Sequence, residues 1–240
     1  MYNIIAIQTA RANSQSIKKK NLLKVNGVPL FLRNILEAKK CNLILDVYCT
    51  TDDKFIIRNS KKFNYKIIKR PKKLAGPKAS HIKVMQHAIN FIEKKKKIKI
   101  DIVVILLGNT IGASSKILEE AIKKIKRNDC VASVSKFNMF NPLRAFKINK
   151  NKLKTIITQN KITKVKNSNE KNVLGDVYFC NGNFWICKRK NFFEKRKSKP
   201  LPWMGKNIIP FKQNVFLELD DIWQIDYVKN SYKISPQNIE

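Results

Sequence analysis

The fold of this chain is decided by the stretch Ile4-Ile5-Ala6-Ile7-Gln8-Thr9-Ala10-Arg11-Ala12-Asn13-Ser14-Gln15-Ser16-Ile17-Lys18-Lys19-Lys20-Asn21. Its first four residues are apolar, and such a run predicts a buried strand. The residues that follow are small, polar and basic. In open α/β sheets, ligands bind at the carboxyl ends of the strands, which is where this loop begins. We therefore expect a ligand site in the loop.

The composition of this loop suits a phosphate group. Ala12, Asn13 and Ser14 are small enough to bring backbone N–H groups close to a ligand. Arg11 and Lys20 supply cationic donors for phosphate oxygens. The spacing matches neither the G-x-x-x-x-G-K-[ST] loop nor the dinucleotide pattern G-x-G-x-x-G. A basic loop that is merely solvated has the same composition, so both interpretations stay open at this point.

Length and composition limit the class of protein. A chain of 240 residues suits one α/β domain with a modest insertion. The sequence has no run of about 18 apolar residues, so we expect no membrane span. It does not begin with a secretory signal pattern, so we expect a cytoplasmic protein. The five cysteines never occur in C-x-x-C spacing, which predicts reduced, buried side chains rather than a disulfide or zinc framework.

The formal net charge of +33 favours binding to polyanions. However, the lysines are spread along the whole chain and accompanied by many isoleucines and asparagines, as a coding bias toward A and T would produce. The sequence also contains no basic motif interleaved with aromatic residues and no zinc-finger spacing. We therefore expect no specific nucleic-acid partner, and only non-specific binding of polyanions at low salt.

Apolar periodicity predicts an alternation of strands and helices. Strands are predicted at 45–50, 65–69, 102–107 and 130–134, and helices at about 29–40, 81–97 and 115–126. The strand at 102–107 is continuously Ile, Val and Leu, which is typical of a central parallel strand buried on both faces. The sequence thus predicts a three-layer α/β/α sandwich with a mainly parallel sheet, in a single domain over 1–240.

Two later segments depart from this alternation. Residues 137–175 alternate hydrophobic and basic side chains and lack helix signals, so we interpret them as a β-rich antiparallel insertion. Asn181-Gly182 stands between two β-rich runs, which is a signal for a tight turn.

Polar residues at the ends of predicted strands are candidates for a site. Thr51 and Asp52 suit the N-cap of a helix that begins at Lys54. His81 and His87 have no Cys or carboxylate at ligand spacing, so we expect neither to bind a metal.

Two acidic residues near the C-terminus favour a cation site. Glu218 and Asp220 alternate on a predicted strand, so their side chains point to the same face. In a chain this basic, two carboxylates aimed together indicate a bound cation. The alternative is that Asp220 or Asp221 caps a final helix.

Taken together, these segments resemble the CMP-sialic acid synthetases, or acylneuraminate cytidylyltransferases. The family's first motif is A-R-G-G-S-K-G-x-x-x-K-N, and the residues that match it in register are Ala10, Arg11, Ser14, Lys20 and Asn21. The residues that depart from it are Ala12, Asn13 and Ser16, in place of glycines, and Gln15, in place of lysine. A non-glycine residue tolerates positive φ less well, so the loop must avoid that conformation or reach it at Asn13.

Four further segments carry the resemblance in the family order. Arg70-Pro71-Lys72-Lys73-Leu74-Ala75 resembles R-P-x-x-L-A, and Asn181-Gly182 opens an N-G-x-x-[YFW] segment. The family's L-L-Q-P-T-S-P-L-R is matched by Leu106, Leu107 and Thr110, while Gly108 replaces its glutamine. The D-I-D that holds Mg²⁺ falls on Glu218 and Asp220.

The resemblance implies that CTP and a nine-carbon 2-keto acid sugar, of sialic, legionaminic or pseudaminic type, give the CMP-sugar and pyrophosphate. It implies Mg²⁺ as cofactor, held by Glu218 and Asp220, and a homodimer formed through 137–175. Its catalytic residues are Arg11, Lys20 and Asp220. The residues it assigns to the nucleotide are Ala10, Arg11, Ala12, Asn13, Ser14, Lys20, Asn21, Arg70 and Ser80. The residues it assigns to the sugar are Gly108, Asn109, Thr110, Asn181 and Gly182.

Two alternatives remain open on the sequence. One is a nucleotidyltransferase of the same fold that activates an eight-carbon ulosonic acid or a sugar phosphate. The other is a non-catalytic relative that binds polyanions, which the replaced glycines and the replaced glutamine make conceivable.

Overall fold

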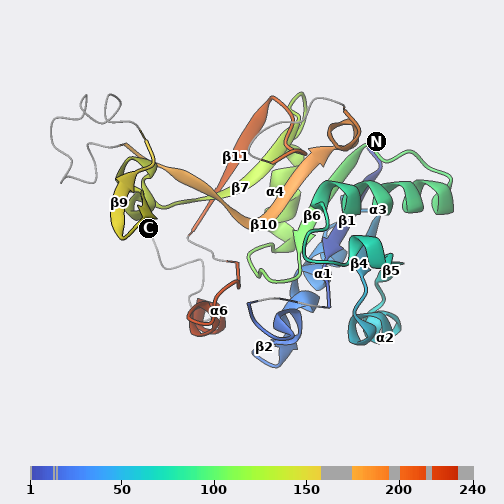
Figure 1. The fold of residues 1–240 in the computed structure, drawn as a ribbon. Helices are drawn as coiled ribbons and strands as arrows, with labels where there is room; N and C mark the ends of the chain where they lie inside the picture. The colour runs from blue at the N-terminus through green and yellow to red at the C-terminus, as the bar shows by residue number, and fades with distance from the viewer. Residues whose placement is uncertain are drawn as a thin grey trace.

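A seven-stranded sheet forms the centre of the computed structural model (Figure 1). The structure describes residues 2–12, 14, 16–157, 175–194, 201–214 and 218–231. The strand order is β11-β7-β10-β6-β1-β4-β5, and β10 runs antiparallel to both of its neighbours while the other described strands of this sheet are parallel. The strands are β1 Ile4–Thr9, β4 Asp46–Thr51, β5 Lys66–Lys69, β6 Ile102–Leu107, β7 Cys130–Lys136, β10 Tyr178–Lys188 and β11 Ile208–Gln213.

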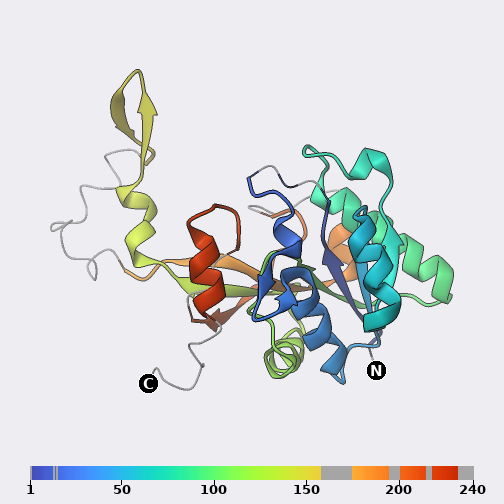
Figure 2. The ribbon, with the colours of Figure 1, turned by 90° about the horizontal axis from the view of Figure 1, so that it is seen from below.

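Helices cover both faces of this sheet, which confirms the predicted three-layer sandwich (Figure 2). Helices α1 Leu30–Lys40, α2 Lys54–Phe63 and α4 Ser115–Lys123 pack their apolar residues on one face. Helix α3 His81–Lys96 packs on the other, where it meets buried side chains such as Ile5 and Val103. Strand β6 is buried on both faces, as its continuous apolar sequence predicts.

Short elements follow the loop after β1. A 3-10 turn, Lys20–Leu22, leads into the hairpin of β2 Lys24–Val25 and β3 Val28–Pro29. The predicted turn at Asn26-Gly27 is confirmed, with φ of 48° and 76° at its two residues. The last described helix is α6, Gln224–Ser231.

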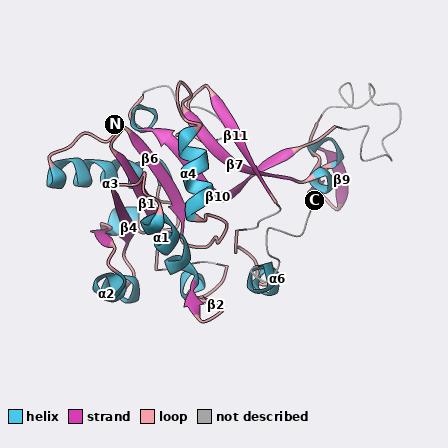
Figure 3. Cartoon of the chain, turned by 180° about the vertical axis from the view of Figure 1, so that it is seen from behind, coloured by secondary structure: helices cyan, strands magenta, loops and turns pink. Residues whose placement is uncertain are grey.

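An arm leaves the body of the molecule at the ends of β7 and β10 (Figures 1 and 3). Two 3-10 turns, Asn138–Phe140 and Pro142–Arg144, lead to a hairpin of β8 Phe146–Asn149 and β9 Lys152–Thr155. The described part of 137–175 therefore confirms an antiparallel insertion, while residues 158–174 lie outside the described residues. Several large hydrophobic side chains of the arm are exposed, among them Met139, Phe140, Phe146, Ile148 and Leu153.

The structure corrects four local predictions. Asn181-Gly182 is not a turn between strands, because β10 continues through it with an irregular register between Cys180 and Trp185. The cap of α2 is Asp53, whose carboxylate accepts from the N–H groups of Phe55 and Ile56. Residues 218–220 form no strand. The five cysteines are free, as predicted, but Cys180 is exposed.

None of the described helices combines the length and the apolar character that crossing a membrane would require.

Candidate nucleotide and metal site

The loop after β1 is tied to the carboxyl end of β4. Ala10 N–H donates to the carbonyl of Thr50 at 3.2 Å. Ala12 N–H donates to Asp52 Oδ1 at 2.9 Å. Asp52 thus takes one of the loop N–H groups that the sequence assigns to a nucleotide. Asn13 lies outside the described residues, and Ser14 is partly exposed.

Asn21 closes the loop from its other end. Its side-chain amide donates to the carbonyl of Arg11 at 3.0 Å, and Asn21 itself is buried. The loop after β6 packs directly against this point. A Cβ on Gly108 would lie 2.9 Å from Ala10 Cβ and 3.3 Å from Asn21 Oδ1. The glutamine expected from the family has no room here, so at this position the backbone alone faces the loop.

Thr110 supports the loop after β6 from inside. Its side chain is fully buried, and the Asn34 amide donates to both its carbonyl and its hydroxyl oxygen at 3.0 Å. Thr110 therefore holds the loop in place, and its side chain has no exposed surface for a sugar. Asn34 comes from α1 and is a supporting residue that the sequence pattern did not indicate.

Arg70 lies at the end of β5, close to the same loop. Its guanidinium is buried and donates to the carbonyl of Thr50 at 2.8 Å, while its Nε has no partner. Burial lowers the pKa of Arg70, the charge of Asp52 opposes this, and the nearby Arg11 adds to it. Three charged side chains from three different loops therefore meet here. Ser80 is the exposed N-cap residue of α3, at the end of that helix which favours anions.

His81 begins α3 beside Arg70. Its Nε2 lies 3.5 Å from the Thr9 hydroxyl, and its ring contacts that of Trp203 in a tilted arrangement with centroids 4.7 Å apart. Burial, together with the charge of Arg70, lowers the pKa of His81 to about 4. The imidazole is therefore neutral at physiological pH.

The loop after β1, where the sequence predicts phosphate binding, and the C-terminal carboxylates meet at Lys20. Lys20 Nζ lies 2.5 Å from Asp220 Oδ1. Asn109 contacts the same carboxylate at 3.4 Å, and its carbonyl accepts from the N–H of Leu219 at 3.0 Å. The structure thus brings together three predicted residues that are far apart in the sequence.

Glu218 lies beside Asp220 and directly above Gly182. A Cβ on Gly182 would lie 2.0 Å from Glu218 Oε1, and φ of Gly182 is +76°. The missing side chain therefore makes space for the carboxylate. Burial and the neighbouring charge of Asp220, partly offset by Lys20, raise the pKa of Glu218 to about 7.

The carboxylates of Glu218 and Asp220 lie close enough together for the pKa of Glu218 to be raised. Such a pair suits a divalent cation. The described residues contain no group of three or more acidic, His or Cys side chains that would complete a metal site. Magnesium commonly uses one or two carboxylates and takes its other ligands from water and substrate phosphates. The pair Glu218 and Asp220 therefore suits Mg²⁺ that arrives with a nucleotide.

Gln224 fixes the segment that carries these carboxylates. Its side-chain oxygen accepts from the N–H groups of Asp220 at 2.6 Å and Asp221 at 2.7 Å. Asn181 is equally constrained, because its amide donates to Ser135 Oγ at 2.9 Å and its oxygen accepts from Asn183 N–H at 3.2 Å.

A pocket of about 310 Å³ opens beside the carboxylates. Its lining includes the polar residues Glu218, Asp220 and Asn181 and the rings of Phe137, Phe140 and Phe179. The sequence pattern did not indicate these aromatic residues, because they come from the base of the insertion and from the outer part of β10.

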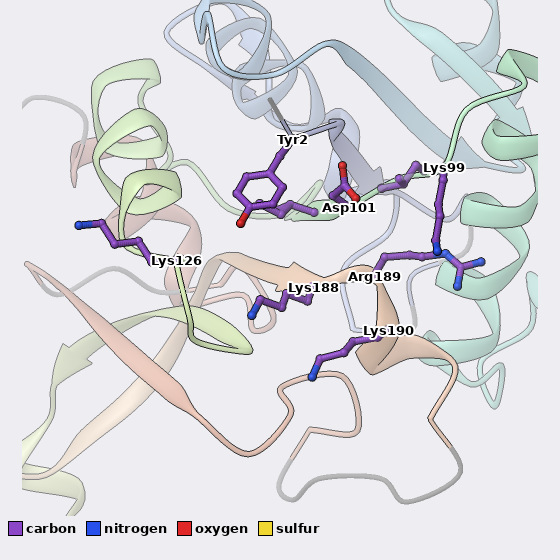
Figure 4. A pocket seen from close by; sticks show the side chains of 9 residues that line it. Tyr2, Lys99, Asp101, Lys126, Lys188, Arg189 and Lys190 are labelled. Atoms are coloured by element: carbon purple, nitrogen blue, oxygen red, sulfur yellow. The ribbon is translucent and has the colours of Figure 1, made fainter.

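Two further hollows lie at the opposite edge of the sheet. One, of about 280 Å³, is lined by Tyr2, Asp101 and several cations (Figure 4). Of these cations, Arg189 is bound by Glu93 at 2.8 Å and Lys190 lies 3.2 Å from Asp129. A second hollow, of about 590 Å³, shares Tyr2 and Lys126 with the first. None of the predicted site residues lines either hollow, so the site belongs to the carboxyl edge.

Comparison with known proteins agrees with this geometry. The chain matches the family model described as cytidylyltransferase over residues 5–231. It is 24% identical over 239 residues to a pseudaminic acid cytidylyltransferase of Campylobacter jejuni subsp. jejuni serotype O:2, with 98% of each chain covered. It is 26% identical over 222 residues to a Helicobacter pylori protein named pseudaminic acid cytidylyltransferase and UDP-2,4-diacetamido-2,4,6-trideoxy-beta-L-altropyranose hydrolase, covering 91% of this chain and 40% of that protein.

Solved structures show the same fold. One is a CMP:2-keto-3-deoxy-manno-octonic acid synthetase complexed with CTP, with a TM-score of 0.67 and 15% identity over 96% of this chain and 98% of that one. Another is a 4-diphosphocytidyl-2C-methyl-D-erythritol synthase, with a TM-score of 0.66 and 7% identity over 95% of this chain and 97% of that one. Since the family model covers nearly the whole sequence, this chain belongs to the cytidylyltransferase family and is a nucleotidyltransferase.

Proposed function

We propose that this protein transfers the cytidylyl group of CTP to a nine-carbon 2-keto acid sugar of the pseudaminic type. The products are the CMP-sugar and pyrophosphate. The observation that carries the proposal is the contact of Lys20 with Asp220, because it joins a phosphate-binding loop to a carboxylate pair at one point. The relatives from Campylobacter jejuni and Helicobacter pylori are named for pseudaminic acid, which supports this sugar.

The nucleotide would lie along the loop after β1. The side chains of Arg11 and Lys20 supply positive charge for the triphosphate, and the loop N–H groups supply further donors. Arg70 and the N-terminus of α3, with Ser80, lie beside the start of this loop and suit the remainder of the nucleotide.

Glu218 and Asp220 would hold Mg²⁺ together with phosphate oxygens. When bound, the ion would neutralise phosphate charge and lower the pKa of the attacking hydroxyl. Gly182 keeps the space for the Glu218 carboxylate open, and Gln224 fixes the backbone at Asp220.

The reaction is an in-line displacement at the α-phosphorus. The anomeric hydroxyl oxygen of the sugar forms the new P–O bond as the bond to pyrophosphate breaks, and the hydroxyl proton passes to solvent or base. There is little covalent chemistry for the protein to perform, so its contribution is positioning and charge stabilisation. Lys20 lies where it can neutralise charge on the phosphates, and the 310 Å³ pocket beside Asp220 is placed to hold the sugar.

A homodimer formed through the arm is part of this proposal. The described part of the arm exposes Ile148, Leu153 and Phe146, with exposed fractions of 78%, 66% and 53%. A second copy of the chain would cover such an apolar surface.

The test is pyrophosphate release with Mg²⁺ and each of the four nucleoside triphosphates, against pseudaminic acid, N-acetylneuraminic acid and 2-keto-3-deoxy-manno-octonic acid. We expect release with CTP and pseudaminic acid. Release with the eight-carbon acid alone would replace the sugar assignment, and release with another triphosphate would replace CTP. An absence of release with all three sugars, in a protein that binds CTP by calorimetry, would refute the proposed class of sugar.

A further inference from the structure

The pocket beside the carboxylates is lined by two chemically different groups of side chains. The first group is Glu218 and Asp220, and the Lys20 ammonium contacts Asp220. The second group is three phenylalanines. Phe137 lies 6.0 Å from Phe140 and 6.1 Å from Phe179 between ring centroids, so the three rings form one continuous cluster. We refer to Phe137, Phe140 and Phe179 as the aromatic wall.

Two chain segments build the aromatic wall and hold it in place. Phe179 is on β10, where it pairs with Ser135 of β7. Phe137 follows β7 directly, and its N–H donates to the carbonyl of Val177 at 3.0 Å. Phe140 is joined to Phe137 by a backbone hydrogen bond of 2.9 Å. The wall therefore lies next to the paired strands β7 and β10 at the base of the arm and is not part of the β8–β9 hairpin.

Two rings of the wall are exposed. Phe179 is 39% exposed and Phe140 is 61% exposed. Large aromatic side chains open to a pocket favour apolar groups of a ligand.

Two polar groups next to the wall are already engaged. The Asn181 amide donates to Ser135 and its oxygen accepts from Asn183 N–H. The Gln224 oxygen accepts from the two N–H groups at Asp220 and Asp221. A ligand hydroxyl placed against the three rings would lose its water there, because an aromatic ring offers no strong hydrogen-bonding group in return. Such an unpaired group is costly, whereas a methyl or acyl group gains by burial.

We infer that the aromatic wall selects a keto acid sugar whose far end is apolar, with acylamido and methyl groups in place of hydroxyls. The inference rests on the proposed function, which puts the anomeric centre of the sugar at the carboxylates of Glu218 and Asp220. The remainder of the sugar then extends across the wall. Pseudaminic acid, which carries two acylamido groups and a terminal methyl, fits this description. N-acetylneuraminic acid carries hydroxyls on its side chain and does not.

The expected selectivity follows from the size of the groups involved. One methyl or methylene in an apolar pocket changes kcat/KM by about 10-fold to 200-fold. The two sugars differ at several positions, so we expect kcat/KM for pseudaminic acid to exceed that for N-acetylneuraminic acid by at least about 100-fold.

The test uses two single variants that each remove one ring of the wall and one variant that removes a ring outside it. Phe179→Ser and Phe140→Ser remove wall rings, and Phe146→Ser is the matched control, because Phe146 is 53% exposed on the hairpin of the same arm and does not line the pocket. Pyrophosphate release is measured with CTP and each of the two sugars, and the oligomeric state is measured by sedimentation. We expect the two wall variants to lose at least about tenfold of the selectivity, mainly through a higher KM for pseudaminic acid.

The outcomes separate this inference from the proposed function. If the wild-type protein uses both sugars equally well, the function stands and the inference is wrong. If Phe146→Ser loses as much selectivity as the wall variants, or if the wall variants act only by dissociating an oligomer, the wall is an interface and the inference is wrong. If the wild-type protein releases pyrophosphate with neither sugar, both the proposed sugar class and the selectivity inferred from it fail.

Discussion

Lys20 Nζ lies 2.5 Å from Asp220 Oδ1, although 200 positions separate the two residues in the sequence. The side chain of Lys20 is 15% exposed and that of Asp220 is 53% exposed. A pair this open to water contributes only about 0–1 kcal/mol to the free energy of unfolding. Its significance is therefore its position, because it lies where the phosphate loop meets the carboxylate pair.

The first prediction concerns these two side chains. Lys20→Ala and Asp220→Ala should each lower kcat/KM for the cytidylyl transfer by at least about 100-fold, the loss typical of one electrostatic stabiliser. The free energy of unfolding should change by less than about 1 kcal/mol, as for an open ion pair. Steady-state kinetics and chemical denaturation measure the two effects.

Lys18→Ala is the matched control for this prediction. Lys18 belongs to the same loop and is exposed, and no ion pair of its side chain occurs among the described residues. Its removal should leave kcat/KM within about twofold of the wild-type value, as for a surface substitution. Unchanged turnover in a folded Asp220→Ala protein would remove Asp220 from the metal site.

The second prediction concerns the space above Gly182. Gly182→Ala would place a Cβ 2.0 Å from Glu218 Oε1 and should displace that carboxylate. We expect weaker Mg²⁺ binding by calorimetry in the presence of CTP, and a loss of turnover of about 10-fold to 100-fold, as for a disturbed metal ligand.

Gly27→Ala provides the control for backbone strain. Gly27 also has φ of +76°, but a Cβ there has nothing within 4 Å. Both variants therefore carry the cost of a left-handed alanine, about 1 kcal/mol. Only Gly182→Ala should weaken Mg²⁺ binding, and equal weakening in both variants would contradict a role for the space above Gly182.

The third prediction uses two adjacent aspartates that perform different tasks. Asp52 accepts from Ala12 N–H in the phosphate loop, whereas Asp53 caps α2. Asp52→Ala should raise KM for CTP by roughly tenfold, because one charge-assisted hydrogen bond that positions the loop is lost. Asp53→Ala should instead lower the free energy of unfolding by about 1 kcal/mol, the usual cost of losing an N-cap.

Kinetics and thermal denaturation of the two aspartate variants give this comparison. A lower KM for CTP in Asp52→Ala would mean that the carboxylate competes with phosphate for the N–H of Ala12. In that case Asp52 would be an inhibitor of binding and not a support for the loop.

The parallel strands of the core could be predicted from the sequence because each has a local apolar pattern. Strand β6 is apolar at every position from Ile102 to Leu107, and that pattern is typical of a strand covered on both faces. Strand β11 gives no such signal, because Pro210 lies inside it and proline cannot donate to a sheet ladder. Its place at the edge of the sheet is what tolerates the proline.

The site could be predicted only in part, because its contacts join residues that are far apart in the sequence. Asn181-Gly182 has the local signature of a turn, yet Gly182 lies within a long strand and makes space for Glu218. Gly108 stands in place of an expected glutamine for a reason that only Ala10 and Asn21 reveal. The aromatic wall combines Phe179 of β10 with Phe137 and Phe140, which follow β7, and no spacing in the sequence encodes the pairing of these two strands.

The last prediction concerns the pH dependence of stability. Burial and Arg70 lower the pKa of His81 to about 4, whereas a histidine in the unfolded chain titrates near its ordinary value of about 6.5. Between these values the unfolded state binds more protons at this residue, so the contribution of His81 to the free energy of unfolding falls as the pH falls from 7 toward 4. For this residue the loss at pH 5 should be about 1–2 kcal/mol. The raised pKa of Glu218 acts in the opposite direction over this range, so the test compares variants with the wild type. From pH 7 to pH 5, the free energy of unfolding of His81→Gln should fall by about 1–2 kcal/mol less than that of the wild type, whereas His87→Gln, the variant of the only other histidine, should follow the wild type more closely. An unchanged pH dependence in His81→Gln would show that other groups, and not His81, set the acid limit of this fold.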